Sequence, residues 1–185
     1  GTAYALHFIV EAENAGYSVP YSVKENLVKY VSGVSKGWKP MQNKPLYVIE
    51  ADVAAQAYRL YVLALNGSYD LGALNRLKEE TGTPLSKCLM AGAYALAGNR
   101  EAGGLLTSVT DYKSGDRSSD LIFGSELRDN ALRLQVLCIL DREAEANMLY
   151  NSVASELASD KWLNTQDIAM ALTSVAWYQK KYGQP

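Results

Sequence analysis

The sequence predicts an all-α protein, because apolar residues recur at intervals of three and four along most of its 185 residues and because cap and stop residues bracket these stretches. Strands are poorly supported. The one strand-like run is Leu46 to Ile49, and the acidic and alanine-rich residues behind it favour the entrance to a helix. The length suits one substantial core, so residues 1–185 are expected to form a single helical domain.

Apolar stripes mark five helices that we expect to lie on the inside of the fold. They are predicted to begin near Thr2, Glu50, Leu85, Glu126 and Thr165. The clearest stripes are Ala54, Ala57, Tyr58, Tyr61, Val62 and Leu65; Leu85, Leu89, Ala93 and Leu96; Leu127, Ala131, Leu134 and Cys138; and Ile168, Leu172 and Val175.

The ends of these helices carry recognisable start and stop residues. Asn66-Gly67 and Gly98-Asn99 supply the positive φ that often ends a helix. Ser125 is a good N-cap, as is Asn164 or Thr165, and Asp167 in the first turn complements the helix dipole.

More polar helices alternate with the apolar ones and are expected to lie outside them. They cover roughly Val23 to Val34, Leu71 to Glu80, Arg100 to Ser108 and Ala144 to Ser159, and linkers are expected at Lys36 to Pro45 and Thr110 to Gly124. The inner helices return at intervals of roughly 40 residues, the length of an αα-hairpin repeat. Such hairpins can close into a ring, curve as an open solenoid or stack as a bundle, and the repeats alone do not distinguish among these three arrangements.

Charge and hydropathy exclude several classes of partner. The formal net charge of −2 comes from scattered acids and bases, so no basic stripe is present to bind nucleic acid. No apolar run reaches the roughly 20 residues that cross a bilayer, so direct membrane insertion of this segment is not expected. The start at Gly1, without an initiator Met and already inside a helical pattern, suggests a fragment of a larger parent.

The residues whose side chains could act in catalysis can each be explained by a structural role. His7 is the only histidine and is expected to pack on an inner helix. The possible acids of a toroid hydrolase are expected to cap helices or form surface ion pairs, and the tyrosines that might line a groove are expected in the core. These acids are Glu50 with Asp52, Glu126 with Asp129, and Asp167; the tyrosines include Tyr4, Tyr47, Tyr58, Tyr61, Tyr94 and Tyr178.

Cys88 and Cys138 are expected as buried apolar residues, and a bridge between them in an oxidising compartment stays open. No Gly-x-Ser-x-Gly elbow and no glycine-rich loop with a lysine is present. We therefore expect no catalytic, cofactor-binding or metal-binding residue, no cofactor and no enzymatic activity in this segment.

Three segments carry a resemblance to a known family. They are Trp162-Leu163-Asn164-Thr165-Gln166-Asp167-Ile168-Ala169-Met170-Ala171-Leu172, the opening Ala3 to Phe8 through Ala15 to Pro20, and Leu127-Arg128-Asp129-Asn130-Ala131-Leu132. In this order they resemble the helical thioester domain of alpha-2-macroglobulins and complement proteins, in its bacterial branch. The resemblance spans nearly the whole chain.

The resemblance implies an α/α toroid of alternating inner and outer helices, here an incomplete ring that lacks its first helices. The thioester motif of that family is Cys-x-Glu-Gln. Cys88 is followed by Leu-Met-Ala and Cys138 by Ile-Leu-Asp, so the motif is carried over to neither cysteine. The thioester is expected upstream of Gly1 in the parent, unless the parent belongs to the paralogues that lack it.

The implied function is that of a non-enzymatic part of a bacterial endopeptidase inhibitor that traps proteases. Its partners would be proteases, met by the intact parent, and neighbouring macroglobulin-like β-domains of the same chain. The implied location is the periplasm or the cell surface, with a parent that can be lipid-anchored. The alternatives left open are a toroid enzyme acting on glycans or terpenoids and a helical-repeat scaffold that binds peptides.

Overall fold

The structure is a computed structural model that describes residues 1–106 and 125–183. Within these residues it contains nine α-helices and no strand, which confirms the all-α prediction. The helices are α1 (Thr2–Asn14), α2 (Tyr21–Gly37), α3 (Leu46–Leu65), α4 (Leu71–Lys78), α5 (Pro84–Leu96), α6 (Arg100–Leu106), α7 (Glu126–Ile139), α8 (Glu143–Leu157) and α9 (Thr165–Tyr182).

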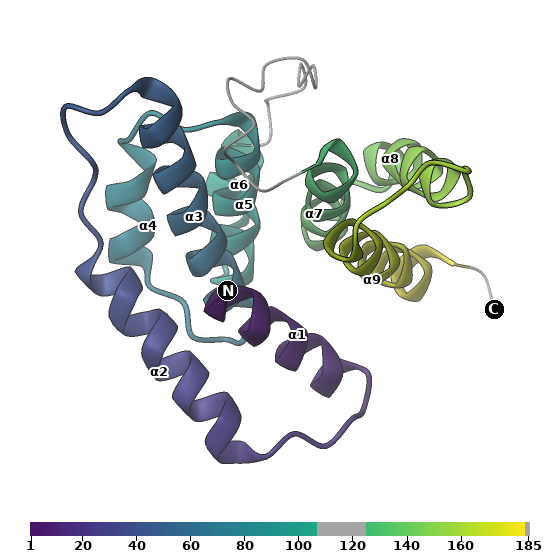
Figure 1. Ribbon diagram of the computed structural model, residues 1–185, viewed down its shortest axis with the longest axis horizontal. Helices are drawn as coiled ribbons and strands as arrows, with labels where there is room; N and C mark the ends of the chain where they lie inside the picture. The colour runs from purple at the N-terminus through teal and green to yellow at the C-terminus, as the bar shows by residue number, and fades with distance from the viewer. Residues whose placement is uncertain (107–124, 184–185) are drawn as a thin grey trace. The chain divides into compact units, whose positions relative to one another are not determined.

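The helices fall into two compact units, α1 to α6 and α7 to α9, each drawn with its labels in Figure 1. In the first unit α3 contacts α1, α2, α4 and α5, so it is the central helix. Its core includes Leu60 and Tyr61 of α3, Leu74 and Leu77 of α4, and Leu89 of α5. The single domain over residues 1–185 stays a prediction.

The second unit is a three-helix assembly in which α7, α8 and α9 all contact one another. One cluster of its core contains Leu134, Leu137 and Cys138 from α7 together with Ala146 from α8. Partly buried side chains from α8 and α9 pack against this core: Leu149, Tyr150, Trp177, Tyr178 and Tyr182.

Most helix boundaries follow the predicted signals. Gly67 and Gly98 have positive φ angles of 75° and 84° just after α3 and α5, and the side chains of Ser125 and Asn164 cap α7 and α9. The predicted start of α3 at Glu50 is four residues late, because Leu46 to Ile49 form its first turn directly after Pro45. The second predicted linker, Thr110 to Gly124, lies outside the described residues.

The first linker is shorter than expected, since Lys36 and Gly37 are the last residues of α2. The tyrosines divide between two environments. Tyr61 and Tyr94 are buried, as expected of core residues, whereas Tyr4, Tyr47, Tyr58 and Tyr178 are half-buried.

The apolar stripe predicted to be the buried side of the last helix is largely exposed, so that prediction is wrong. Ile168 and Leu172 of α9 are 39% and 56% exposed, and Val175 is half-buried. The buried face of α9 consists of Asp167, Met170, Ala171 and Ser174 instead. Because α9 is apolar on two sides, the periodicity of the sequence does not reveal which side packs against α7 and α8.

Candidate functional site: buried polar side chains at helix starts

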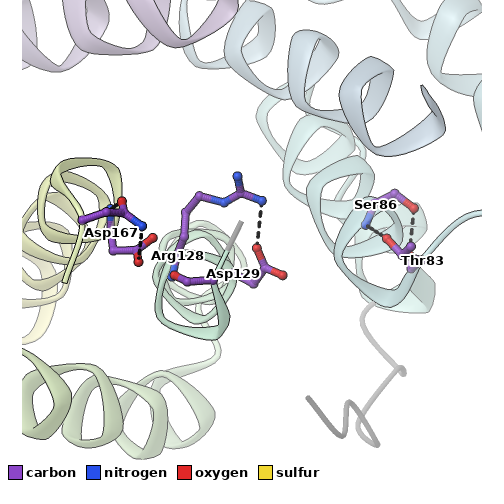
Figure 2. A network of polar contacts seen from close by, with 7 residues as sticks. Thr83, Ser86, Arg128, Asp129 and Asp167 are labelled. Atoms are coloured by element: carbon purple, nitrogen blue, oxygen red, sulfur yellow. Dashed lines mark hydrogen bonds and ion pairs between the residues drawn. The ribbon is translucent and has the colours of Figure 1, made fainter. Parts of the chain in front are cut away.

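Three helices, α5, α7 and α9, begin with a buried polar side chain that a local contact satisfies. At the start of α5, Thr83 Oγ1 accepts a hydrogen bond from the backbone N–H of Ser86 at 3.2 Å. Ser86 Oγ donates to the backbone carbonyl of Thr83 at 2.7 Å, as Figure 2 shows. Ser86 is completely buried, so this local pairing satisfies a hydroxyl that has no access to water.

The start of α7 contains a capped end and an ion pair. Ser125 Oγ accepts from the backbone N–H of Arg128 at 3.0 Å. The guanidinium of Arg128 then donates to Asp129 Oδ1 at 3.1 Å (Figure 2). Asp129 is only 5% exposed, so the arginine supplies the positive charge that a buried carboxylate requires.

The start of α9 forms a reciprocal pair. Asn164 Oδ1 accepts from the backbone N–H of Asp167 at 2.9 Å, and Asn164 Nδ2 donates to Asp167 Oδ2 at 2.8 Å. The carboxylate of Asp167 therefore lies buried in the first turn, where the helix dipole favours negative charge. This arrangement differs from a capping box, because Asp167 accepts from the side-chain amide of Asn164 and not from its backbone N–H.

These contacts assign structural partners to the acids that the sequence offered as catalytic candidates. Asp129 pairs with Arg128, Asp167 with Asn164, and Asp52 accepts a hydrogen bond from Trp38 Nε1 at 2.8 Å. Glu126 is exposed and Glu50 is half-buried. The geometry supports capping and ion pairing for these carboxylates, and the absence of catalytic residues stays a prediction.

Replacing the cap of α9 gives a direct test of this assignment. We expect Asn164→Ala to lower the free energy of unfolding by about 1 kcal/mol, since it removes the acceptor for a first-turn N–H and the amide that holds Asp167. Urea denaturation followed by circular dichroism measures the change. Asn164→Ser keeps an acceptor for the first-turn N–H without adding a second charge beside Asp167, and it is the matched control. An alanine variant as stable as the unsubstituted chain would show that the cap has no energetic role.

His7 occupies the packed position that the sequence predicted. It is 2% exposed, and its Nδ1 shares a hydrogen bond of 2.9 Å with the hydroxyl of Tyr58. Its Nε2 lies 3.6 Å from a carboxylate oxygen of Glu11, and its ring meets Tyr61 edge-on. His7 therefore joins α1 to α3.

The two cysteines form no disulfide, and Cys88 is half-buried whereas Cys138 is fully buried. Burial raises the pKa of the Cys138 thiol to about 11, and the nearby ammonium of Lys181 offsets part of that rise. A thiol with such a pKa is a poor nucleophile at neutral pH.

The sequence interpretation missed a buried amide between α2 and α3. Gln56 is 1% exposed, and its Nε2 donates to the backbone carbonyl of Ser35 at 3.1 Å and to Ser35 Oγ at 2.8 Å. The position of Gln56, three residues after Val53 and four before Leu60, was the signal, since both of those neighbours belong to the buried face.

Membrane-spanning helices and metal clusters are both missing from residues 1–106 and 125–183. No helix there has the length and apolar character needed to cross a membrane. No group of three or more His, Cys, Asp or Glu side chains in the same residues is placed to hold a metal ion.

Comparisons with known proteins agree with one another. The alpha-2-macroglobulin of Escherichia coli (strain K12) is 30% identical in an alignment 180 residues long, which covers 90% of this chain and 10% of that protein. The chain thus spans about a tenth of the length of this curated relative. No protein-family model matches.

Solved structures show the same fold. The native conformation of E. coli alpha-2-macroglobulin has a TM-score of 0.74 and 26% identity, covering 96% of this chain and 12% of that one. Salmonella alpha-2-macroglobulin reacted with methylamine has a TM-score of 0.76 and 25% identity, covering 95% of this chain and 12% of that one. The E. coli structure from domain MG7 to the C-terminus has a TM-score of 0.75 and 25% identity, covering 98% of this chain and 29% of that one. In sequence and in fold, the chain accordingly matches a helical part of bacterial alpha-2-macroglobulins, as a fragment of a much larger protein.

Proposed function

We propose that this segment is a non-enzymatic part of a bacterial protease-trapping inhibitor and that it belongs to a thioester-type α/α toroid. The observation that carries the proposal is the agreement of sequence and structure over nearly the whole chain with alpha-2-macroglobulins of two bacteria. The alternation of more apolar and more polar helices along the sequence supports the toroid. In this proposal the segment is the later part of a ring whose first helices lie elsewhere in the parent.

The chemistry of the parent would be covalent capture. A thioester is an activated acyl group, so it must be kept from water until a protease cleaves the parent. A nucleophile on the protease would then attack the thioester carbonyl, form an amide or ester, and release the cysteine thiol as the C–S bond breaks. One of the structural relatives is a Salmonella protein reacted with methylamine, a primary amine, which suits such an acyl group. Neither Cys88 nor Cys138 begins Cys-x-Glu-Gln, so we assign the thioester to another part of the parent.

One detail of the sequence refines the proposal. No histidine occurs between Lys36 and Glu50, the loop that resembles the one carrying a transfer histidine in the complement branch. We therefore propose that the parent favours amines, such as surface lysines, over hydroxyls.

We also propose that the parent lies in the periplasm or at the cell surface, with a lipid anchor as one means of retention. There it would meet proteases, and neighbouring macroglobulin-like β-domains would complete it.

A trapping assay with the purified parent tests the proposal. After incubation with trypsin, we expect cleavage of a large protein substrate to fall sharply while cleavage of a small peptide substrate persists, because a trapped protease is shielded from large molecules only. The 185-residue chain alone is the control and should inhibit neither reaction. Equal inhibition of both substrates would indicate active-site blockage, and no inhibition of either would contradict trapping altogether.

The same 185-residue chain separates the alternatives. Turnover of glycans or terpenoid diphosphates by this chain would favour the toroid enzyme. The ion-paired and capping roles of Asp129 and Asp167 favour the inhibitor, because acids engaged by Arg128 and Asn164 already have partners within the fold.

A further inference from the structure

The turn between α3 and α4 contains Asn66-Gly67, the one asparagine in the sequence that is followed by glycine. This pair is chemically labile, because glycine has no side chain to shield its backbone nitrogen. That nitrogen can attack Cγ of Asn66 and form a cyclic imide, as the Cγ–Nδ2 bond breaks and ammonia leaves with the proton of Gly67. Water then opens the ring and leaves aspartate or isoaspartate at position 66. The reaction needs no reagent other than water.

The folded turn keeps the Gly67 nitrogen out of position for this attack. Asn66 has a ψ of 0°, so the Gly67 nitrogen eclipses the backbone nitrogen of Asn66. Ring closure requires it to eclipse the Cα–Cβ bond instead, because the five-membered ring contains that bond. Gly67 itself has a φ of 75°, a left-handed conformation that glycine adopts without strain. The attack therefore requires a large rotation about ψ of Asn66.

Three hydrogen bonds resist that rotation. The Gly67 N–H donates to the carbonyl of Ala64 at 2.9 Å, and the Ser68 N–H donates to the carbonyl of Leu63 at 2.8 Å. These two bonds form the pattern of a Schellman motif, which ends the helix. The side chain is held as well, since Asn66 Nδ2 donates to Ser68 Oγ at 3.0 Å. Rotation about ψ of Asn66 displaces Gly67 and Ser68 together, so the turn must open before the reaction can begin.

The surroundings of the side-chain oxygen also oppose the reaction and its product. Asn66 Oδ1 is buried and accepts no hydrogen bond from the residues that the structure describes. The attack places negative charge on this oxygen, and a site without donors gives that charge no stabilisation. Aspartate at position 66 would place a carboxylate there, at the C-terminal end of α3, where the helix dipole disfavours negative charge. Isoaspartate would also add a methylene group to the backbone of the turn.

We propose that Asn66 is a modification site, which loses its side-chain ammonia only when the α3–α4 turn opens and whose product prevents the turn from closing again in the same form. The last turns of α3 include Val62, Leu63 and Ala64, all of them buried, and α4 contacts α3. A turn that cannot close therefore weakens the packing around the central helix of the first unit. Conversion accumulates with each opening, so the modified fraction records how often the turn has opened. The inference is independent of protease trapping.

Mass spectrometry of the 185-residue chain tests the proposal. The chain is incubated at mildly alkaline pH, once folded and once unfolded in guanidinium chloride. Peptides that contain position 66 are then separated into their asparagine, aspartate and isoaspartate forms. We expect conversion in the folded chain to be slower by about tenfold or more, because the open turn is a minor state. Equal rates in the folded and unfolded chains would overturn the proposal.

Ser68→Ala tests the hydrogen bond to the amide. It removes the acceptor for Asn66 Nδ2 and leaves the backbone unchanged, so conversion of the folded chain should be faster by about threefold to tenfold. The rate in guanidinium chloride should not change. Ser152→Ala, at an exposed position on α8, is the matched control and should convert at the rate of the unsubstituted chain. Equal rates for the two folded variants would contradict the role of this contact.

Asn66→Asp reproduces the aspartate product directly. The change is isosteric and adds only charge, so we expect the unfolding equilibrium constant of the first unit to rise by about tenfold. Urea denaturation followed by circular dichroism measures the change. Asn151→Asp, at an exposed position on α8, adds the same charge in water and is the matched control. An Asn66→Asp chain as stable as the control would overturn the claim that the product keeps the turn from closing.

Discussion

Leu134→Ala is expected to lower the free energy of unfolding of the second unit by about 2 to 5 kcal/mol. Leu134 is completely buried on α7, where it joins Leu137, Cys138 and Ala146 in the core of that unit. Truncation removes buried methyl groups and leaves a cavity that three short helices are poorly able to close. Urea denaturation of the 185-residue chain measures the loss.

The matched control is Leu172→Ala on α9. The same atoms are removed there from a side chain that is 56% exposed, so we expect a change within about 0.5 kcal/mol. Because the two units can unfold in separate transitions, tryptophan fluorescence is followed together with the far-ultraviolet signal. Trp177, which packs against the core of the second unit, contributes to that fluorescence. Equal losses from the two variants would mean that the burial pattern of α9 and α7 is not the one described.

The contrast between α7 and α9 explains how far helical periodicity determines the fold. The predicted stripe of α7, formed by Leu127, Ala131, Leu134 and Cys138, is buried throughout. On α9 the predicted stripe is the exposed side, because Met170 and Ala171 give the opposite side a comparable apolar surface. Periodicity locates a helix and its apolar sides, and only tertiary contacts decide which side is covered.

The polar ends of the helices were partly predictable for a local reason. An N-cap acts within one turn of chain, so Ser125 and Asn164 were recognised from their place before an apolar run. The Gln56–Ser35 pair joins residues 21 positions apart and depends on how α2 lies against α3. A one-dimensional pattern contains no information about that packing, and it likewise does not choose between a ring, a solenoid and a bundle.

Reaction of Cys138 with a disulfide reagent at pH 8 is expected to be far slower than reaction of Cys88. Burial raises the pKa of Cys138 from 9.0 to about 11, and such a rise reduces the thiolate at pH 8 by about 100-fold. The complete burial of the side chain slows access further. Single-cysteine variants, Cys88→Ser and Cys138→Ala, assign each phase of the reaction, and the rate for Cys138 should keep rising with pH toward about 11.

The direction of this pKa shift also determines how stability depends on pH. The native state holds the Cys138 proton more tightly than the unfolded chain does. The stabilisation from the protonated thiol is therefore fully present below pH 9.0 and is lost as the pH rises toward about 11. Cys138→Ala has no thiol to ionise, and its stability should fall less over that range. Rapid labelling of Cys138 at pH 8, together with parallel pH profiles for the two chains, would show that the thiol is solvated and that the core of the second unit is open.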